Sequence, residues 1–145
     1  MINSLKNIEN ILEEHIASLV EEFDISLIYI FGSFAKGNNT KESDIDIAFL
    51  LNGDIDGYTK LNLLGKLVDI FKREDIDLII LNKSNEILQF QVIKYGKAIY
   101  MDSLYNKVVF ESRTMSRYMD MEHFRETQQE YSHKKFLDIM DEKSI

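Results

Sequence analysis

The chain has 145 residues, of which 45% are hydrophobic, and this composition suits one globular domain rather than a disordered segment. It has no cysteine and only three well-separated histidines, which excludes disulfides and argues against a zinc motif, so any metal must be bound by oxygen. The net charge of −8 argues against a long nucleic acid as main partner but allows a small nucleotide held through a divalent cation.

The first half of the chain predicts two helices, two strands and a short helical turn. Apolar residues recur at helical spacing over residues 4–23, with glutamates on the other face. Residues 26–31 are β-branched and aromatic and predict a strand. One helical turn is expected at residues 34–36, a second strand at residues 44–51 and a helix at about residues 58–71.

The next elements are shorter. Residues 75–81 predict a third strand that begins with acidic side chains, and residues 85–94 predict a short helix. We expect Gly96 to end that helix in the left-handed conformation typical of a glycine at this position. Residues 97–100 then predict a short fourth strand.

The chain is expected to finish as one long helix that begins at about Asp102. Its apolar side chains on or near one side are Leu104, Val108, Met115, Tyr118, Met119 and Met121, and the pattern fades after Glu122. Apolar residues near the end, Phe136, Leu137, Ile139 and Met140, have no obvious core to enter, and fit a solvated helix or a partner-docking segment equally well. We predict a single domain over residues 1–145, with a core at about residues 5–125 and a charged tail at residues 126–145.

This order of elements predicts an α/β (α+β) fold, in which a small mixed β-sheet is flanked by helices and followed by the long C-terminal helix. Alternation along the second strand puts Asp44, Asp46 and Ala48 on the face opposite Ile45, Ile47 and Phe49. The third strand carries Asp75 and Asp77, which share a face. If the two strands are neighbours, three carboxylates converge at one edge of the sheet.

Such a cluster suits the chemistry of phosphoryl groups. Carboxylate oxygens are preferred ligands of Mg²⁺, and three carboxylates allow a pair of ions about 3.5–4 Å apart that stabilises the attacking and leaving oxygens of an in-line displacement. Gly32 would let backbone approach a phosphate closely, and Ser33 with the amides that follow it could hold phosphates at a helix start. Asp-x-Asp alone is common at the start of strands, but three acids aimed at one place repel one another unless a cation neutralises them.

The motif carries a family resemblance. The segment from Gly32-Ser33-Phe34-Ala35-Lys36-Gly37 to Ser43-Asp44-Ile45-Asp46 resembles the signature of the DNA polymerase β-like nucleotidyltransferase superfamily. A chain this short is most similar to the minimal nucleotidyltransferases (MNT proteins), many of which are antitoxins encoded beside a HEPN-domain ribonuclease toxin. The resemblance implies the nucleotidyltransferase fold, Asp44 and Asp46 as metal ligands, Asp77 (in preference to Asp75) as third carboxylate, and Ser33 as a triphosphate contact. Lys36 supplies a phosphate-binding charge or is an ordinary surface lysine.

By this resemblance the protein is expected to be a Mg²⁺-dependent enzyme that transfers AMP from ATP to a tyrosine of a HEPN toxin, with which it forms a hetero-oligomer. Asp77 is the candidate general base. The alternatives are an antitoxin that acts by binding alone, a small-molecule (aminoglycoside-like) nucleotidyltransferase and a template-independent RNA polymerase. The apolar runs are too short to span a bilayer and the N-terminus lacks a secretory pattern, so we expect a cytoplasmic location without membrane contact.

Overall fold

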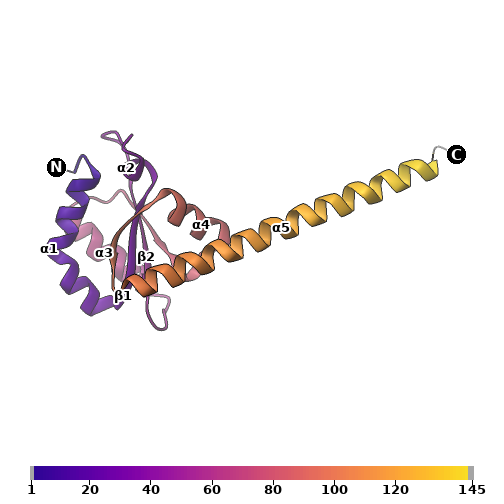
Figure 1. Ribbon diagram of the computed structural model, residues 1–145. Coiled ribbons are helices and arrows are strands. Elements are labelled where there is room, and N and C mark those ends of the chain that lie inside the picture. The colour runs from indigo at the N-terminus through magenta and orange to yellow at the C-terminus, as the bar shows by residue number, and fades with distance from the viewer. Residues whose placement is uncertain (1, 144–145) are drawn as a thin grey trace.

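A computed structural model describes residues 2–143 of the chain, with side chains over residues 2–141. Its helices and strands follow the predicted order (Figure 1). They are α1 Leu5–Phe23, β1 Ile25–Phe31, α2 Gly32–Lys36, β2 Ile45–Leu51, α3 Thr59–Phe71, β3 Ile76–Ile80, the 3-10 turn η1 Leu81–Lys83, α4 Glu86–Tyr95, β4 Lys97–Met101 and α5 Leu104–Lys143.

The four strands form one mixed sheet in the order β3-β2-β1-β4, which confirms the predicted fold class. Strand β1 is antiparallel to both β2 and β4, while β2 and β3 are parallel. The two strands that bear the acidic motifs are therefore neighbours, and their register pairs Asp46 with Asp77. The third strand is shorter than expected because Leu81 turns into η1.

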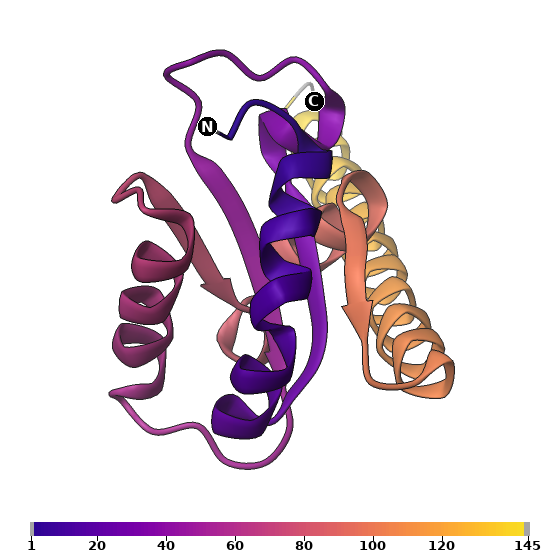
Figure 2. The same ribbon diagram turned by 90° about the vertical axis from the view of Figure 1, so that its left-hand side faces the viewer.

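Helices cover both faces of the sheet (Figure 2). Helices α1 and α3 pack on one face, against a core that includes Ile45, Ile47 and Phe49. The start of α5 and helix α4 cover the other face, where Tyr29 and Ala48 are buried. The predicted alternation along β2 is thus confirmed, and the face that carries Asp46 is the face under α4 and α5.

The prediction for Gly96 was wrong. Its φ is −84°, so this backbone is not left-handed, and any residue could adopt it. A glycine is required here by space, because an added Cβ would lie 2.4 Å from the Val92 carbonyl oxygen and 3.0 Å from that of Ile30. The glycine lets the end of α4 approach β1 closely.

Helix α5 uses a different face from the predicted one. Its inward side presents Phe110, Glu111, Thr114 and Tyr118, and the Tyr29 hydroxyl donates a hydrogen bond to Glu111 Oε1 at 2.7 Å. Leu104, Val108, Met115 and Met119, expected on the buried side, are 41–63% exposed. Tyr118 does pack inward, stacked on Phe90 of α4 with 3.9 Å between ring centroids.

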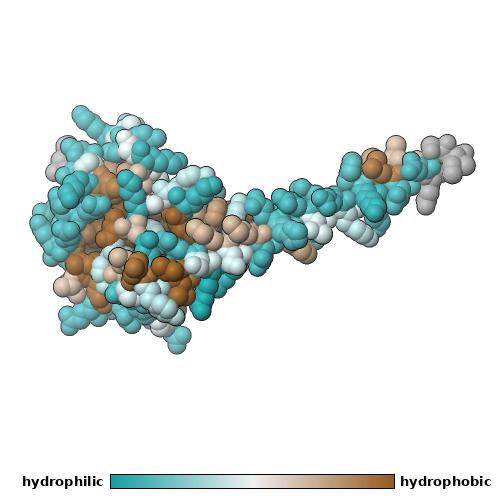
Figure 3. Space-filling model, in the orientation of Figure 1, coloured by the Kyte–Doolittle hydropathy of each residue, from teal (hydrophilic) through white to brown (hydrophobic). Residues whose placement is uncertain are grey.

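Beyond Met121, helix α5 leaves the rest of the molecule and projects as an isolated rod (Figures 1 and 3). Every side chain described from Glu122 to Asp141 is exposed. The predicted tail is therefore helical as far as Lys143, and its last two residues lie outside the described part of the chain. Among the helices described, none is long and apolar enough to cross a membrane.

Candidate active site

The turn from β1 into α2 brings Gly32 against Asp46. Strand β1 ends at Phe31, which pairs with Asp46 of β2, and Gly32 opens α2 with a φ of +70°. An added Cβ on Gly32 would lie 2.0 Å from Asp46 Oδ2. Gly32 is therefore needed both for its left-handed backbone and for the space that the Asp46 carboxylate occupies. The two halves of the sequence motif, ten residues apart, are in direct contact.

Asp46 and Asp77 lie side by side on paired positions of β2 and β3. Burial raises the pKa of Asp46 to about 6, and the negative charges of Asp77 and Asp44, with a hydrogen bond shared with Asp77, act in the same direction. Asp77 is more exposed than Asp46 and belongs to the edge strand of the sheet. The site is thus a partly buried carboxyl group beside a more exposed one.

Asp44 lies just before β2 rather than inside it, and its side chain is exposed. Its charge acts on Asp46 and also on Arg73. The expected convergence of carboxylates is thus observed as a contact between Asp46 and Asp77, with Asp44 nearby and coupled through its charge.

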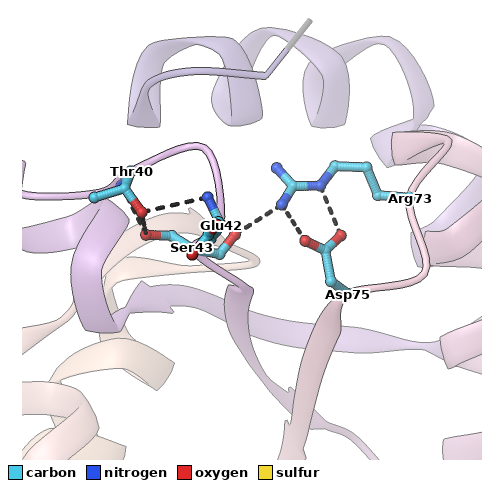
Figure 4. Close-up of polar contacts among 5 residues, drawn as sticks. All are labelled: Thr40, Glu42, Ser43, Arg73 and Asp75. Atoms are coloured by element: carbon cyan, nitrogen blue, oxygen red, sulfur yellow. Dashed lines mark hydrogen bonds and ion pairs between the residues drawn. The ribbon is translucent and has the colours of Figure 1, made fainter.

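Asp75, the alternative third carboxylate, is occupied elsewhere (Figure 4). Arg73 Nε donates a hydrogen bond to Asp75 Oδ1 at 2.7 Å, and Arg73 Nη2 contacts the other carboxylate oxygen. This ion pair lowers the pKa of Asp75 and raises that of Arg73. Because Arg73 neutralises Asp75, whereas no cationic side chain among residues 2–141 forms an ion pair with Asp77, the geometry favours Asp77 as the acid that joins Asp46.

Arg73 also reaches across to the other acidic segment. Its Nη2 donates a second hydrogen bond, of 2.7 Å, to the carbonyl oxygen of Ser43, the residue before Asp44 (Figure 4). No motif in the sequence singles out Arg73, which follows the end of helix α3. The only signal is that Arg73 stands two residues before Asp75, a spacing that puts two side chains on one side of an extended segment.

Ser33 and Lys36 both belong to α2. Phe34 and Ala35 of this short helix are buried, while Ser33 is half-buried and Lys36 is exposed. No side chain caps the first turn of α2, and its C-terminal end is closed by Gly37, whose N–H donates to the Ser33 carbonyl oxygen. The predicted phosphate-binding residues therefore lie on the helix that begins at Gly32, beside Asp46, and no side chain caps the amides of its first turn.

The donor set of the site fits a hard divalent cation. Asp44, Asp46 and Asp77 offer carboxylate oxygen alone, which is the chemistry that Mg²⁺ prefers. Within residues 2–143, no three His, Cys, Asp or Glu side chains already stand in a complete metal-binding arrangement. The fit therefore rests on the acidic pair, on the raised pKa of Asp46 and on the nearby charge of Asp44.

A large cavity lies on the face covered by α1 and α3. It has a volume of about 1020 Å³, and its walls include Ile11, Ile70 and Phe71. It shares Arg73 and Asp75 with the ion pair described above, whereas Asp46 and Asp77 lie outside it. The acidic pair therefore does not line this cavity, and a large substrate could approach it at Asp77, which is exposed on the edge strand β3.

Comparisons with known proteins agree with this geometry. The family described as "Polymerase beta, Nucleotidyltransferase" matches residues 6–104. Protein adenylyltransferase MntA of Shewanella oneidensis is 32% identical over 98 residues, which are 68% of this chain and 69% of that protein.

Two solved structures are also similar. A toxin–antitoxin crystal structure with AMP-PNP superimposes with a TM-score of 0.68 at 30% identity, covering 79% of this chain and 93% of that one. The second structure is a tri-AMPylated Shewanella oneidensis HEPN toxin in complex with MNT antitoxin. It gives a TM-score of 0.64 at 27% identity and covers 82% and 93% of the two chains.

Proposed function

The chain belongs to the polymerase β nucleotidyltransferase family, and from this premise we propose that it is an MNT antitoxin that transfers AMP from ATP to a tyrosine hydroxyl of a HEPN ribonuclease toxin. The transfer silences the toxin and depends on Mg²⁺, with two ions expected. Asp44, Asp46 and Asp77 are the proposed catalytic and metal-binding residues. Gly32, Ser33 and Lys36 are the proposed nucleotide-binding residues.

One observation supports this proposal above all, namely the contact between Asp46 and Asp77. Asp46 also lies against Gly32, where there is no room for a side chain. A site for binding alone has no use for a partly buried carboxylate held against a second one, because the two repel. That repulsion is useful where a cation and a polyphosphate must be drawn in. Divalent cations held by Asp44, Asp46 and Asp77 would neutralise the triphosphate and polarise its α-phosphorus.

In the proposed reaction the tyrosine oxygen attacks the α-phosphorus of ATP. A new O–P bond forms, the bond between the α-phosphorus and the oxygen that bridges to the β-phosphate breaks, and pyrophosphate leaves. The phenol has an ordinary pKa of about 10, so its proton must be removed as the bond forms. Asp77 is the proposed base because it is the accessible member of the acidic pair and stands on the edge strand, where a protein acceptor can reach it.

The triphosphate would lie over α2. Ser33 and the uncapped first-turn amides of α2 can donate hydrogen bonds to its β- and γ-oxygens, and the exposed Lys36 can add a positive charge. Phe34 is buried in the core and therefore serves packing rather than phosphate binding.

The acceptor is proposed to be a protein rather than a small molecule. The acidic pair lies outside the large cavity, with Asp77 exposed on the edge strand, and helix α5 extends far beyond the sheet, as a docking element would. The net charge of −8 suits a basic partner, as expected for a ribonuclease that itself binds RNA. The expected location is cytoplasmic, where such a toxin would act.

The direct test is transfer of label from α-labelled ATP to the toxin encoded beside this chain. Wild-type chain and the exposed-loop control Asp54→Asn are expected to label the toxin with Mg²⁺ present, and Asp44→Asn with Asp46→Asn is expected to abolish labelling. If the double variant still neutralises the toxin in cells without labelling it, the binding-only alternative is correct and the catalytic proposal is wrong.

A further inference from the structure

The loop between α2 and β2 has to deliver Asp44 to the site without belonging to a strand. Residues 38–44 form no helix or strand, and most of their side chains are exposed. Thr40 and Ser43 bond one another, through the Thr40 N–H to Ser43 Oγ at 2.8 Å and the Ser43 N–H to the Thr40 carbonyl at 3.2 Å. These contacts shape the loop but do not fix it to the sheet.

The attachment to the sheet comes from Arg73 and Asp75, and it brackets Asp44. On one side of Asp44, the Ser43 carbonyl oxygen accepts a hydrogen bond from Arg73 Nη2 at 2.7 Å. On the other side, the Ile45 N–H donates to the backbone oxygen of Asp75 at 3.0 Å. The residues before and after Asp44 are therefore both tied to the segment that leads into the neighbouring strand β3, and Figure 4 shows the attachment at Ser43.

Arginine has the right shape for this task. Its planar guanidinium presents several donors in fixed directions, so Nε and Nη2 can hold the Asp75 carboxylate while Nη2 also reaches Ser43. A lysine could pair with Asp75 as a point charge but could not hold both groups at fixed angles. The side chain of Arg73 is only 20% exposed, so solvent disturbs these bonds little.

Asp75 has a second effect in this arrangement. The charge of Asp44 reaches Arg73, so an arginine without its own carboxylate would be drawn to Asp44. By satisfying Arg73, Asp75 leaves the Asp44 carboxylate free for another cation. Removing Arg73 would thus loosen the backbone beside Asp44. Removing Asp75 would leave Arg73 without its carboxylate, so that Arg73 could pair with Asp44 instead.

We propose that Arg73, oriented by Asp75, is a positioning residue that fixes the backbone just before Asp44, while the Asp75 backbone holds Ile45 just after it, and that Arg73 so sets the affinity of the site for a divalent cation. The inference rests on the proposed function in one respect, namely that Asp44 is a metal ligand. It assigns the Arg73–Asp75 ion pair a role beyond joining the end of α3 to β3.

The test is Mn²⁺ binding to the purified full-length chain without nucleotide, measured by electron paramagnetic resonance. Arg73→Lys keeps the positive charge but removes the planar set of guanidinium donors. Asp75→Asn removes the carboxylate that pairs with Arg73. The matched control is Arg113→Lys, the same substitution at an exposed arginine. We expect Arg73→Lys and Asp75→Asn each to weaken Mn²⁺ binding about tenfold or more, as removal of an outer-shell partner of a metal ligand commonly does. The control should bind as the wild type does.

Hydrogen exchange on the same proteins separates positioning from general stability. In Arg73→Lys the amides of residues 43–45 should exchange faster, while core amides of β1 and β2 stay protected. Unchanged Mn²⁺ affinity in Arg73→Lys and Asp75→Asn overturns the inference, and so does a loss of affinity accompanied by loss of protection throughout the core.

Asp44→Asn distinguishes this inference from the proposed function. If Asp44→Asn weakens Mn²⁺ binding and Arg73→Lys does not, the positioning role is wrong and the metal site stands. If Asp44→Asn binds Mn²⁺ as tightly as the wild type does, Asp44 is not a ligand, and both proposals are wrong.

Discussion

Gly32 is the residue on which the site depends most directly. Its φ of +70° and the 2.0 Å that would separate an added Cβ from Asp46 Oδ2 both exclude any other residue. We expect Gly32→Ala to displace the Asp46 carboxylate and lower the transfer rate about 100-fold or more, since displacements near 1 Å have such effects on catalysis. Gly37→Ala is the matched control, because Gly37 also has a left-handed φ, +78°, but has nothing within 4 Å.

The comparison of these two variants is made on initial transfer rates and on thermal unfolding. Both replacements carry the backbone strain of a left-handed alanine, about 1 kcal/mol. Only Gly32→Ala should show a loss of transfer rate much larger than its loss of stability explains. Equal losses of activity in the two variants would show that the contact with Asp46 is unimportant.

Asp46 should leave a signature in the pH dependence of stability. Its pKa is raised to about 6 in the folded protein from an ordinary value of 3.8, so its contribution to stability is fully present below about pH 3.8 and is lost as the pH rises through about 6. In the absence of divalent cations, Asp46→Asn should therefore unfold at a higher temperature than the wild type at pH 7.5, with the difference shrinking towards pH 4. A variant less stable than the wild type at pH 7.5 would contradict the assignment.

The sequence predicted the acids of the site but not how they are partnered. Asp44 and Asp46 follow from their spacing on one strand. Asp75 and Asp77 have the same spacing and the same face, so the pattern alone could not separate them. The difference lies in Arg73, whose hydrogen bonds depend on the meeting of three segments that sequence spacing does not describe.

At the scale of elements, the junction between α4 and β4 depends on Gly96. An alanine there would place its Cβ 2.4 Å from the Val92 carbonyl oxygen and 3.0 Å from that of Ile30, which are backbone atoms that cannot turn away. We expect Gly96→Ala to lower the free energy of unfolding by about 1–3 kcal/mol, the range typical of overpacking. Urea denaturation measures this.

Gly65→Ala, the same replacement at another glycine, is expected to raise stability where Gly96→Ala lowers it. Gly65 lies inside α3, is exposed, and has nothing within 4 Å of an added Cβ. Alanine should stabilise that helix by about 0.5–1 kcal/mol. A destabilised Gly65→Ala, or an unchanged Gly96→Ala, would contradict this description of the two helices.

Helix α5 shows why its buried face was predicted incorrectly. Its contact side includes Glu111 and Thr114, which look polar in the sequence, because Tyr29 hydrogen-bonds to Glu111 and Thr114 bonds to the Phe110 carbonyl. Lys107 forms an ion pair with the same glutamate at 3.3 Å. Periodicity counts apolar residues, so it selected Leu104, Val108, Met115 and Met119, which are exposed, together with Tyr118 and Met121, which are partly buried.

At the scale of the whole molecule, the structure divides into a sheet with its helices and a projecting helical rod. Because every side chain described from Glu122 to Asp141 is exposed, the rod adds little packing to the rest. Deletion of residues 126–145 should therefore change the midpoint of thermal unfolding by no more than about 2 °C, the scale of a few tenths of a kcal/mol. A fall of more than about 5 °C would show that the proposed core at residues 5–125 is not independent of the tail.

The overall topology was predictable because each element has a clear period and the connections are short. The mixed sheet and the long last helix follow from that pattern, whereas the adjacency of the two acid-bearing strands was left open and is found in the structure. The sequence left open what the far end of α5 contacts, and in the structure Phe136, Leu137, Ile139 and Met140 are 43–57% exposed on the projecting helix.

The measurement that tests the central claim most directly is the mass of the neighbouring toxin after it is produced together with this chain. With wild-type chain, intact mass should rise by whole adenylate units, and peptide mapping should place them on tyrosine. With Asp44→Asn and Asp46→Asn combined, the toxin should keep its unmodified mass. A toxin that is unmodified beside the wild-type chain, or equally modified beside the double variant, would contradict the account.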